Sequence, residues 1–142
     1  MSATGLKVFD TTIQTTHVWL DDLMNELAWK DERQRAYHAL RAVLHVLRDR
    51  LPVDNVAHLA AQLPMLIRGI YYEGWHPAGT PVPEHSQDEF LAHVTDAFLF
   101  DVNAHSKTIT QAVFKVLACH VTPGEIEKVK RVLPAGIREL WP

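Results

Sequence analysis

The chain has 142 residues, ordinary apolar content and a formal net charge of -3 at pH 7. Its length is that of one domain able to bury about two thirds of its unfolded surface, and its balance of apolar and charged residues disfavours both disorder and a strongly basic nucleic-acid binder. A lone cysteine, Cys119, excludes an internal disulfide, and neither a signal peptide nor a membrane span is evident, so we expect a soluble, cytoplasmic protein.

The first two predicted helices are long and amphipathic. Asp10 is the expected N-cap of a helix over about 11–28. Apolar residues recur along it at helical spacing, namely Ile13, Leu20, Leu23 and Leu27. Asp31 with Gln34 three residues later is typical of a capping box, so a second helix is expected to follow and to end at Pro52, which cannot continue the hydrogen-bond ladder.

Two shorter helices and a hinge complete the first half. Asp54 is the expected cap of a third helix that Pro64 interrupts, and a fourth runs from Met65 to about Glu73. Residues 74–85 are too rich in proline and glycine for regular structure. We therefore expect a hinge at about 74–85.

The second half predicts a similar succession of helices. Ser86 begins a capping box for one helix, and Asn103 is the expected cap of the next. Thr122, Pro123 and Glu125 then supply a cap, a first-turn proline and a reciprocal capping partner. No alternating segment is long enough to pair as a strand, so the fold is expected to be all-α.

Two stretches about 70 residues apart repeat one pattern, which is typical of a duplicated helical subdomain. The repeat signature consists of Leu63, Pro64, Ile67 and Arg68 in the first copy, and of Leu133, Pro134, Ile137, Arg138 and Trp141 in the second. The expected architecture is a helical bundle of two three-to-four-helix halves, about 11–77 and 86–142, within a single domain over 1–142. Because the matches fall on packing positions, they predict a shared fold and no shared chemistry.

Each copy also places a tryptophan on the same helix face as its signature arginine. Trp75 follows Arg68 by seven residues and Trp141 follows Arg138 by three. This spacing suggests that the guanidinium group stacks on the indole ring in both halves.

A polar stripe follows the second predicted helix. Its members, His38, Arg41, His45 and Arg48, are spaced three, four and three residues apart and share one face. Arginine holds a phosphate or carboxylate through two parallel hydrogen bonds, so the stripe is a candidate site for a small anionic ligand or metabolite. The alternative is the solvated face that every amphipathic helix needs.

Large aromatic residues lie just before the hinge. Tyr71 and Trp75 are candidate contacts to that same ligand or to a protein partner. Their alternative role is core packing, which is usual for aromatic residues at helical spacing.

Motifs for metal binding and catalysis are missing. Despite nine histidines, the sequence has no His-Glu-x-x-His helix, no cysteine pair and no close spacing of histidine and carboxylate, so neither a metal nor another cofactor is expected. It also has no Gly-x-Ser-x-Gly elbow and no phosphate-binding glycine loop. We therefore expect that the protein is not an enzyme.

DNA binding is a further hypothesis. The run from Thr122 to Val132 opens like a helix-turn-helix unit, in which Lys128, Lys130 and Arg131 would contact phosphates. Acidic residues on the same helix and the acidic balance of the whole chain argue against it. Nucleic acid is thus the least favoured partner.

Four motifs between Ala36 and Pro77 carry a family resemblance: Leu40-Arg41-Ala42-Val43-Leu44-His45, Leu47-Arg48-Asp49-Arg50-Leu51, Ala61-Gln62-Leu63-Pro64 and Tyr71-Tyr72-Glu73-Gly74-Trp75. In this combination the chain closely resembles the bacterial family catalogued as domain of unknown function 2267. The resemblance covers nearly the whole chain. It implies an all-helical fold with two related halves in the bacterial cytoplasm, and it supplies no catalytic or ligand-binding residue.

These observations favour a non-enzymatic helical interaction module that acts through a protein partner or through self-association. The sequence does not assign the surface that such a module would use. The anionic-ligand site on the polar stripe remains the alternative.

Overall fold

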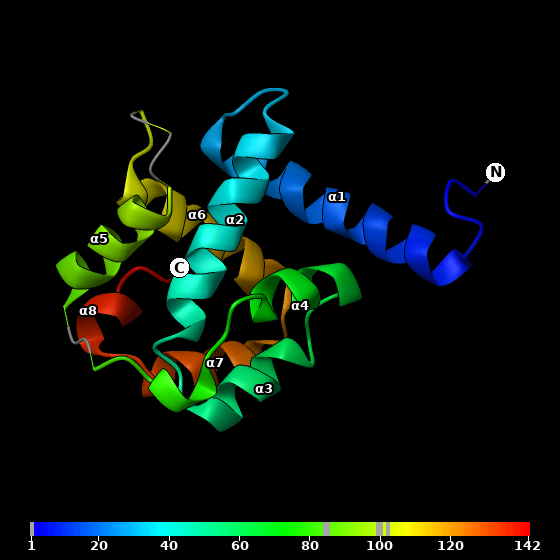
Figure 1. Ribbon diagram of the computed structural model, residues 1–142. Helices are drawn as coiled ribbons and strands as arrows, with labels where there is room; N and C mark the ends of the chain where they lie inside the picture. The colour runs from blue at the N-terminus through cyan, green and yellow to red at the C-terminus, as the bar shows by residue number, and fades with distance from the viewer. Residues whose placement is uncertain (1, 84–85, 99–100, 102) are drawn as a thin grey trace.

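The computed structural model describes residues 2–83, 86–98, 101 and 103–142 (Figure 1). Within these ranges the chain forms eight α-helices, one short 3-10 turn and no strand, so the predicted all-α class is confirmed. The elements are α1 (Lys7–Leu27), α2 (Arg33–Arg48), α3 (Val53–Ala60), α4 (Met65–Tyr72), η1 (Pro77–Gly79), α5 (Gln87–Ala97), α6 (Ser106–His120), α7 (Pro123–Val132) and α8 (Ala135–Arg138). The predicted hinge contains only η1 over 74–83, and its last two positions, 84 and 85, lie outside the described residues.

Helix α2 lies at the centre of the bundle (Figure 1). It packs against α1, α4, α5 and α6, and α6 in turn contacts α1, α5 and α7. Leu40, Val43, Leu44 and Leu47 of α2 are at most 1% exposed. The apolar core therefore surrounds α2 and α6, while α3 and α7 pair at one end of the bundle.

The pairing of helices parallels the two predicted halves. α1 packs on α2 and α6, and α5 packs on the same two helices. The contact of α4 with α1 in the first half corresponds to that of α8 with α5 in the second. Between the halves, α2 packs against α6 and α3 packs against α7. A duplicated bundle would have these pairings, and the duplication itself stays a prediction. The halves also differ, because α1 and α4 are longer than α5 and α8.

Two predicted N-caps are confirmed at α5 and α7. Ser86 Oγ accepts a hydrogen bond from the backbone N–H of Glu89 at 3.1 Å. Thr122 Oγ1 accepts one from the N–H of Glu125 at 3.4 Å, with Pro123 in the first turn. Both hydroxyl groups satisfy a backbone donor that a helix start leaves unpaired.

The reciprocal capping role predicted for Glu125 is wrong. The backbone N–H of Thr122 donates instead to Gln62 Oε1 at 2.9 Å, a contact that reaches across from the end of α3. Glu125 is consequently turned inward and only 6% exposed, and its Oε2 has no hydrogen-bond partner among the described atoms. A buried carboxylate oxygen without a partner destabilises the fold.

The other predicted caps are also wrong, because the helices begin elsewhere. Asp10 lies inside the first turn of α1, where its carboxylate accepts hydrogen bonds from Ser2 and Thr4. Asp31 has a φ of 58°, in the left-handed region, and α2 starts two residues later. The N-caps of α3 and α6 are Pro52 and His105, not Asp54 and Asn103.

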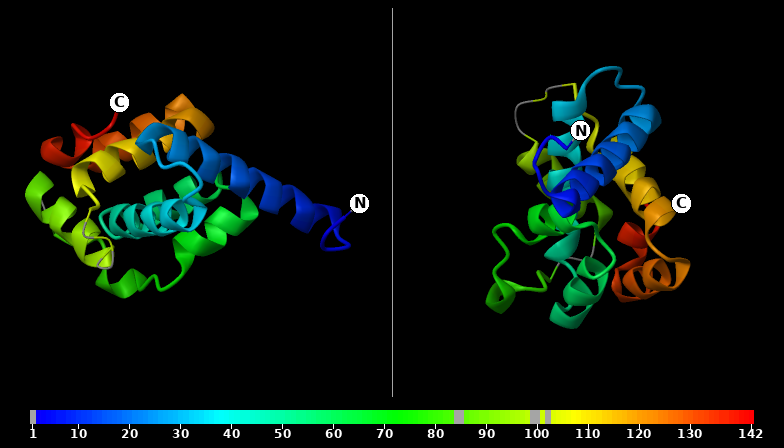
Figure 2. Two further views of the ribbon diagram at one scale, coloured as in Figure 1. Left: turned by 90° about the horizontal axis from the view of Figure 1, so that it is seen from above. Right: turned by 90° about the vertical axis from the view of Figure 1, so that its right-hand side faces the viewer.

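The N-terminal part of α1 projects beyond the bundle (Figures 1 and 2). Trp19, Leu20 and Leu23 are buried further along the helix, whereas no residue of 7–15 is buried. Ile13, which shares helical spacing with Leu20 and Leu23, lies outside the core, since it is 37% exposed. The apolar periodicity of α1 continues towards its N-terminus past the point where the other helices cover it. Within the described residues, no helix is long and apolar enough to cross a membrane.

Candidate functional site

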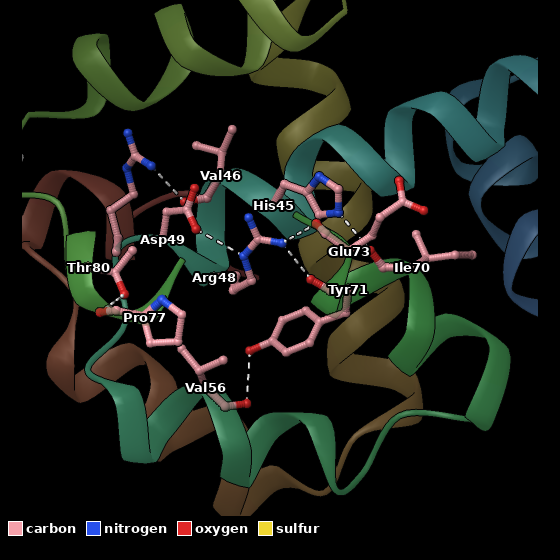
Figure 3. Close-up of polar contacts among 11 residues, drawn as sticks. His45, Val46, Arg48, Asp49, Val56, Ile70, Tyr71, Glu73, Pro77 and Thr80 are labelled. Atoms are coloured by element: carbon pink, nitrogen blue, oxygen red, sulfur yellow. Dashed lines mark hydrogen bonds and ion pairs between the residues drawn. The ribbon is translucent and has the colours of Figure 1, made fainter. Parts of the chain in front are cut away.

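The C-terminal half of the polar stripe of α2, His45 and Arg48, faces the C-terminal end of α4 (Figure 3). Burial increases along the stripe, from exposed His38 through half-buried Arg41 and His45 to Arg48, which is only 3% exposed. Most of the stripe is therefore neither a solvated helix face nor the lining of an open pocket. It packs against another helix of the same half.

Arg48 is held by backbone carbonyls at the end of α4. Its Nη1 donates to the carbonyl oxygens of Tyr71 at 2.8 Å and Glu73 at 2.9 Å, and its Nε donates to Asp49 Oδ1 at 2.9 Å. The last carbonyls of a helix lack partners within the helix and carry partial negative charge. The guanidinium group satisfies two of them and fixes the end of α4 against α2.

His45 and Arg41 extend the same interaction. His45 Nε2 lies 2.6 Å from the carbonyl oxygen of Ile70, and since a carbonyl only accepts, this nitrogen carries the proton. Burial lowers the pKa of His45, and the charges of Arg48 and Arg41 lower it further, so the ring is neutral at neutral pH. Arg41 pairs with the carboxylate of Glu73, and this hydrogen bond lowers the pKa of Glu73.

The predicted anion site is not assembled as a cleft. His45 and Arg48 direct donors at carbonyls of α4, and Arg41 directs one at Glu73. These three contacts occupy the hydrogen-bond donors that the ligand hypothesis needs for binding a phosphate or carboxylate. The stripe therefore acts as a clamp on the end of α4.

The two candidate aromatic contacts occupy different environments. Tyr71 is fully buried and its hydroxyl group donates to the carbonyl oxygen of Val56 at 3.0 Å, as the core-packing alternative expects. Trp75 is half-buried against Tyr72, with ring centroids 5.6 Å apart. Tyr71 is thus inaccessible to a ligand from solvent.

The signature arginines of the two halves make matching hydrogen bonds. Arg68 donates to the carbonyl oxygens of Ala60 and Leu63, both at 2.9 Å. Arg138 donates to those of Lys130 at 2.9 Å and Leu133 at 2.8 Å, which are the equivalent positions 70 residues later. Each arginine therefore satisfies carbonyls at the end of the preceding helix, α3 or α7.

The predicted stacking of these arginines on tryptophan is wrong. In the part of the chain that the structure describes, arginine lies over the rings of Trp29 and Phe90 and not over those of Trp75 or Trp141. Trp141 stacks on Phe114 instead, with centroids 4.0 Å apart. Carbonyls at the helix ends compete for the guanidinium group because they offer two directed hydrogen bonds.

A different feature stands out on the surface: an apolar face shared by α1 and α4, which we call the α1–α4 surface. Its large side chains are each 37–51% exposed, and they are Leu6, Val8, Phe9, Ile13, Met65 and Leu66. Two adjoining hollows of about 530 and 490 Å³ lie along it. Both hollows are lined by Thr12 and Met65, where α1 crosses the start of α4.

The crossing of α1 over α4 is fixed by a hydrogen bond. Thr12 Oγ1 accepts from the backbone N–H of Leu66 at 3.0 Å. The N-cap of α4 is Pro64, whose side chain offers no acceptor, so a hydroxyl group from another helix satisfies this donor. The surface therefore has a defined geometry, although half of it lies on the projecting part of α1.

Among the residues of the second half that the structure describes, nothing is equivalent to this surface. At 70 residues' offset, Met65 and Leu66 correspond to Ala135 and Gly136. There Gln87, at the start of α5, packs directly on α8, and its Nε2 donates to the carbonyl oxygen of Gly136 at 2.8 Å. α5 starts at that point, so within the described part of the chain the first nine residues of α1, 7–15, have no helical counterpart. The apolar face is an addition to the bundle.

Sequence reasoning missed this surface because the missing information is three-dimensional. The helix predicted over about 11–28 excludes Val8 and Phe9, and its apolar periodicity includes Ile13 without indicating what covers it. Apolar residues at the start of an amphipathic helix give the same sequence pattern whether another helix covers them or they are exposed. The available signal was the greater length of the first helix pattern relative to its counterpart.

The remaining chemistries gain no support from the described residues. Within 2–83, 86–98, 101 and 103–142, no three His, Cys, Asp or Glu side chains gather as metal ligands. α8, the helix after α7, spans four residues, too few to serve as the recognition helix of a helix-turn-helix unit. Of the basic residues on α7, Lys130 pairs with Glu127 at 3.5 Å.

Comparison with known proteins gives one finding. The family model described as "Uncharacterized conserved protein (DUF2267)" matches residues 16–140, which is most of the chain. No curated protein matches the chain. The matched segment starts at Thr16 and so leaves out the projecting residues 7–15.

Proposed function

This chain belongs to the DUF2267 family of uncharacterised conserved proteins, and we propose that it is a non-enzymatic helical interaction module that binds protein through the α1–α4 surface. The bundle formed by the other helices positions this surface. The resemblance to a bacterial family and the lone cysteine support a role in the bacterial cytoplasm.

The observation that carries this proposal is the exposure of large apolar side chains on adjoining faces of two helices. Phe9 is 46% exposed, Met65 50% and Leu66 41%. The largest contiguous apolar patch on a soluble monomer is often its binding site. Aromatic residues and methionine are also enriched at protein interfaces.

The alternative of a small anionic ligand is weaker for a physical reason. A ligand at the α2 stripe would have to displace the carbonyls of Ile70, Tyr71 and Glu73 from His45 and Arg48. Such displacement would leave several carbonyl groups at the end of α4 without partners, each at about 1–3 kcal/mol when buried.

The proposed function is tested by photocrosslinking in living cells. A photoreactive amino acid replaces Leu66 in one variant and Val53 in a control, because Val53 is equally exposed at 43% but lies on α3. We expect a discrete crosslinked product from position 66 and none from position 53. No product at 66, or the same products at both positions, would overturn the proposal.

A further inference from the structure

The α1–α4 surface contains both a ridge and a hollow. Leu6, Phe9 and Ile13 are spaced three and four residues apart, so they form an apolar ridge along the projecting end of α1. Beside this ridge lies the hollow of about 490 Å³, which is lined on the α4 side by Leu66, Gly69 and Ile70. Nothing lies within 4 Å of the position that a Cβ at Gly69 would take, so a second helix can approach α4 closely there.

Resting on the function proposed above, we propose that the occupant of this surface is a second copy of the chain. The projecting ends of the two α1 helices pair antiparallel about a two-fold axis, and each copy places its Phe9 and Ile13 ridge against the α4 hollow of the other. In a two-fold contact the same patch must complement itself. A patch that holds both a ridge and a hollow meets that condition.

The charges at the edge of the surface are self-complementary as well. Lys7 lines one end and has no ion-pair partner among the described residues. Glu73 lines the hollow at the other end, and its side chain is 63% exposed beside Arg41. An antiparallel second copy brings its Lys7 to this carboxylate and receives the reciprocal pair, which fixes the register.

A lipid surface fits the same patch poorly. Membrane-surface helices carry Lys and Arg on their polar face to attract anionic headgroups. Between Ser2 and Val18, the only Lys or Arg is Lys7, and Asp10 opposes its charge. Charge therefore favours a self-matching protein partner over an anionic lipid surface.

The exposed area suits a weak dimer. A large apolar side chain has a full area of roughly 150–200 Å², so six of them at 37–51% exposure present on the order of 450 Å². Two copies would bury about 900 Å² of apolar surface plus a polar rim, near the lower limit of roughly 1,200 Å² for specific interfaces. An interface of this size is typical of weak, transient contacts, so we expect an association that appears only as the concentration of the chain rises.

Open space around the helix allows this arrangement. Figure 2 shows the start of α1 extending away from the other helices, which leaves room for a second α1 to lie along it and reach α4. The antiparallel arrangement also opposes the two helix dipoles. Residues 7–15 thus serve as the dimerisation element of the chain.

Sedimentation analysis over a range of concentrations tests the inference. The wild-type chain should change from monomer to dimer with concentration, and Phe9→Glu should weaken association at least tenfold. Val53→Glu is the matched control, with 43% exposure against 46% for Phe9, and it should dimerise like the wild type. A wild-type chain that stays monomeric at all concentrations, or a Phe9→Glu chain that dimerises as tightly as the wild type, would overturn the second-copy inference.

Mixing two charge-reversed chains tests the register. Lys7→Glu and Glu73→Lys should each dimerise more weakly than the wild type, and an equimolar mixture should pair preferentially as a heterodimer because both reciprocal ion pairs are restored. A mixture that pairs no better than either chain alone contradicts this register. Should the crosslink from position 66 in cells join only a different protein while the purified chain stays monomeric, the second-copy inference fails and the proposed function stands.

Discussion

Replacing Arg48 with methionine tests the assignment of the α2 stripe as a clamp on α4. The substitution keeps a long apolar side chain and removes every donor. It leaves the carbonyls of Tyr71 and Glu73, and the carboxylate of Asp49, without their present partner. Arg48 is 3% exposed, so water cannot readily replace the lost bonds.

The expected loss follows from these contacts. Removing one partner of a buried charged hydrogen-bond network destabilises by about 3–5 kcal/mol, a large share of the roughly 7–20 kcal/mol expected for a chain of this length. Arg48→Lys should recover only part of this loss, because an ammonium group lacks the fork of the guanidinium group. Arg41→Met should have a much smaller effect, because the pair with Glu73 is open to solvent.

Urea unfolding followed by circular dichroism measures these differences, with the slope of the transition checked for two-state behaviour. The clamp assignment predicts the order Arg48→Met, Arg48→Lys, Arg41→Met from most to least destabilised. A loss below about 1 kcal/mol for Arg48→Met would refute it. Refutation would be stronger if phosphate raised the melting temperature of the wild type and not that of the variant.

Three further predictions concern the titration of His45, the buried Glu125 and the signature arginines. Because burial lowers the pKa of His45 below its ordinary value of 6.5, the contribution of this residue to the free energy of unfolding is fully present above about pH 6.5 and is lost as the pH falls. His45→Gln, which keeps a donor for the carbonyl of Ile70, should flatten this part of the stability-versus-pH curve. An unchanged curve would contradict the burial argument. Glu125→Met should stabilise the fold by about 1 kcal/mol in chemical denaturation, because Oε2 lacks a partner and only the backbone N–H of this residue is used in capping. A clear loss of stability would reveal an interaction of this carboxylate that the fold requires. Arg68→Met and Arg138→Met should lower the free energy of unfolding by similar amounts, about 1–3 kcal/mol each, because the two guanidinium groups make equivalent hydrogen bonds to backbone carbonyls. Strongly unequal losses would count against a shared role.

The helices could be predicted because their apolar periodicity is local. The stretch from Met65 to Glu73 and the caps at Ser86 and Thr122 were recognisable from neighbouring residues alone, and the structure agrees within one residue at the end of α4. Predicted caps failed where another segment changed the start of the helix. Asp10, for example, is bound by residues that precede the helix.

The role of the polar stripe could not be predicted, because it depends on contacts between distant segments. Spacing correctly placed His45 and Arg48 on one helix face. Their partners are carbonyls 23–25 residues away in α4, and backbone carbonyls leave no trace in a sequence pattern. A basic stripe that binds a ligand and one that caps a neighbouring helix therefore look the same in one dimension.

The predicted repeat indicated where the halves should agree, and the function proposed here lies where they differ. The signature positions Arg68 and Arg138 make equivalent bonds. Met65 and Leu66, by contrast, stand opposite Ala135 and Gly136. Large apolar residues at these places, together with the longer α1, distinguish the first half.

The central claim is that the α1–α4 surface serves binding and not the stability of the fold. A chain carrying Val8→Ser, Phe9→Glu, Ile13→Ser and Met65→Glu measures both properties at once, because position 66 stays free for the photoreactive amino acid. In dilute solution its free energy of unfolding should fall by no more than about 2 kcal/mol, at about 0.5 kcal/mol for each of the four substitutions, because these side chains are 37–51% exposed. Its crosslinking and self-association should disappear. Unfolding weakened by several kcal/mol, with association intact, would contradict the claim.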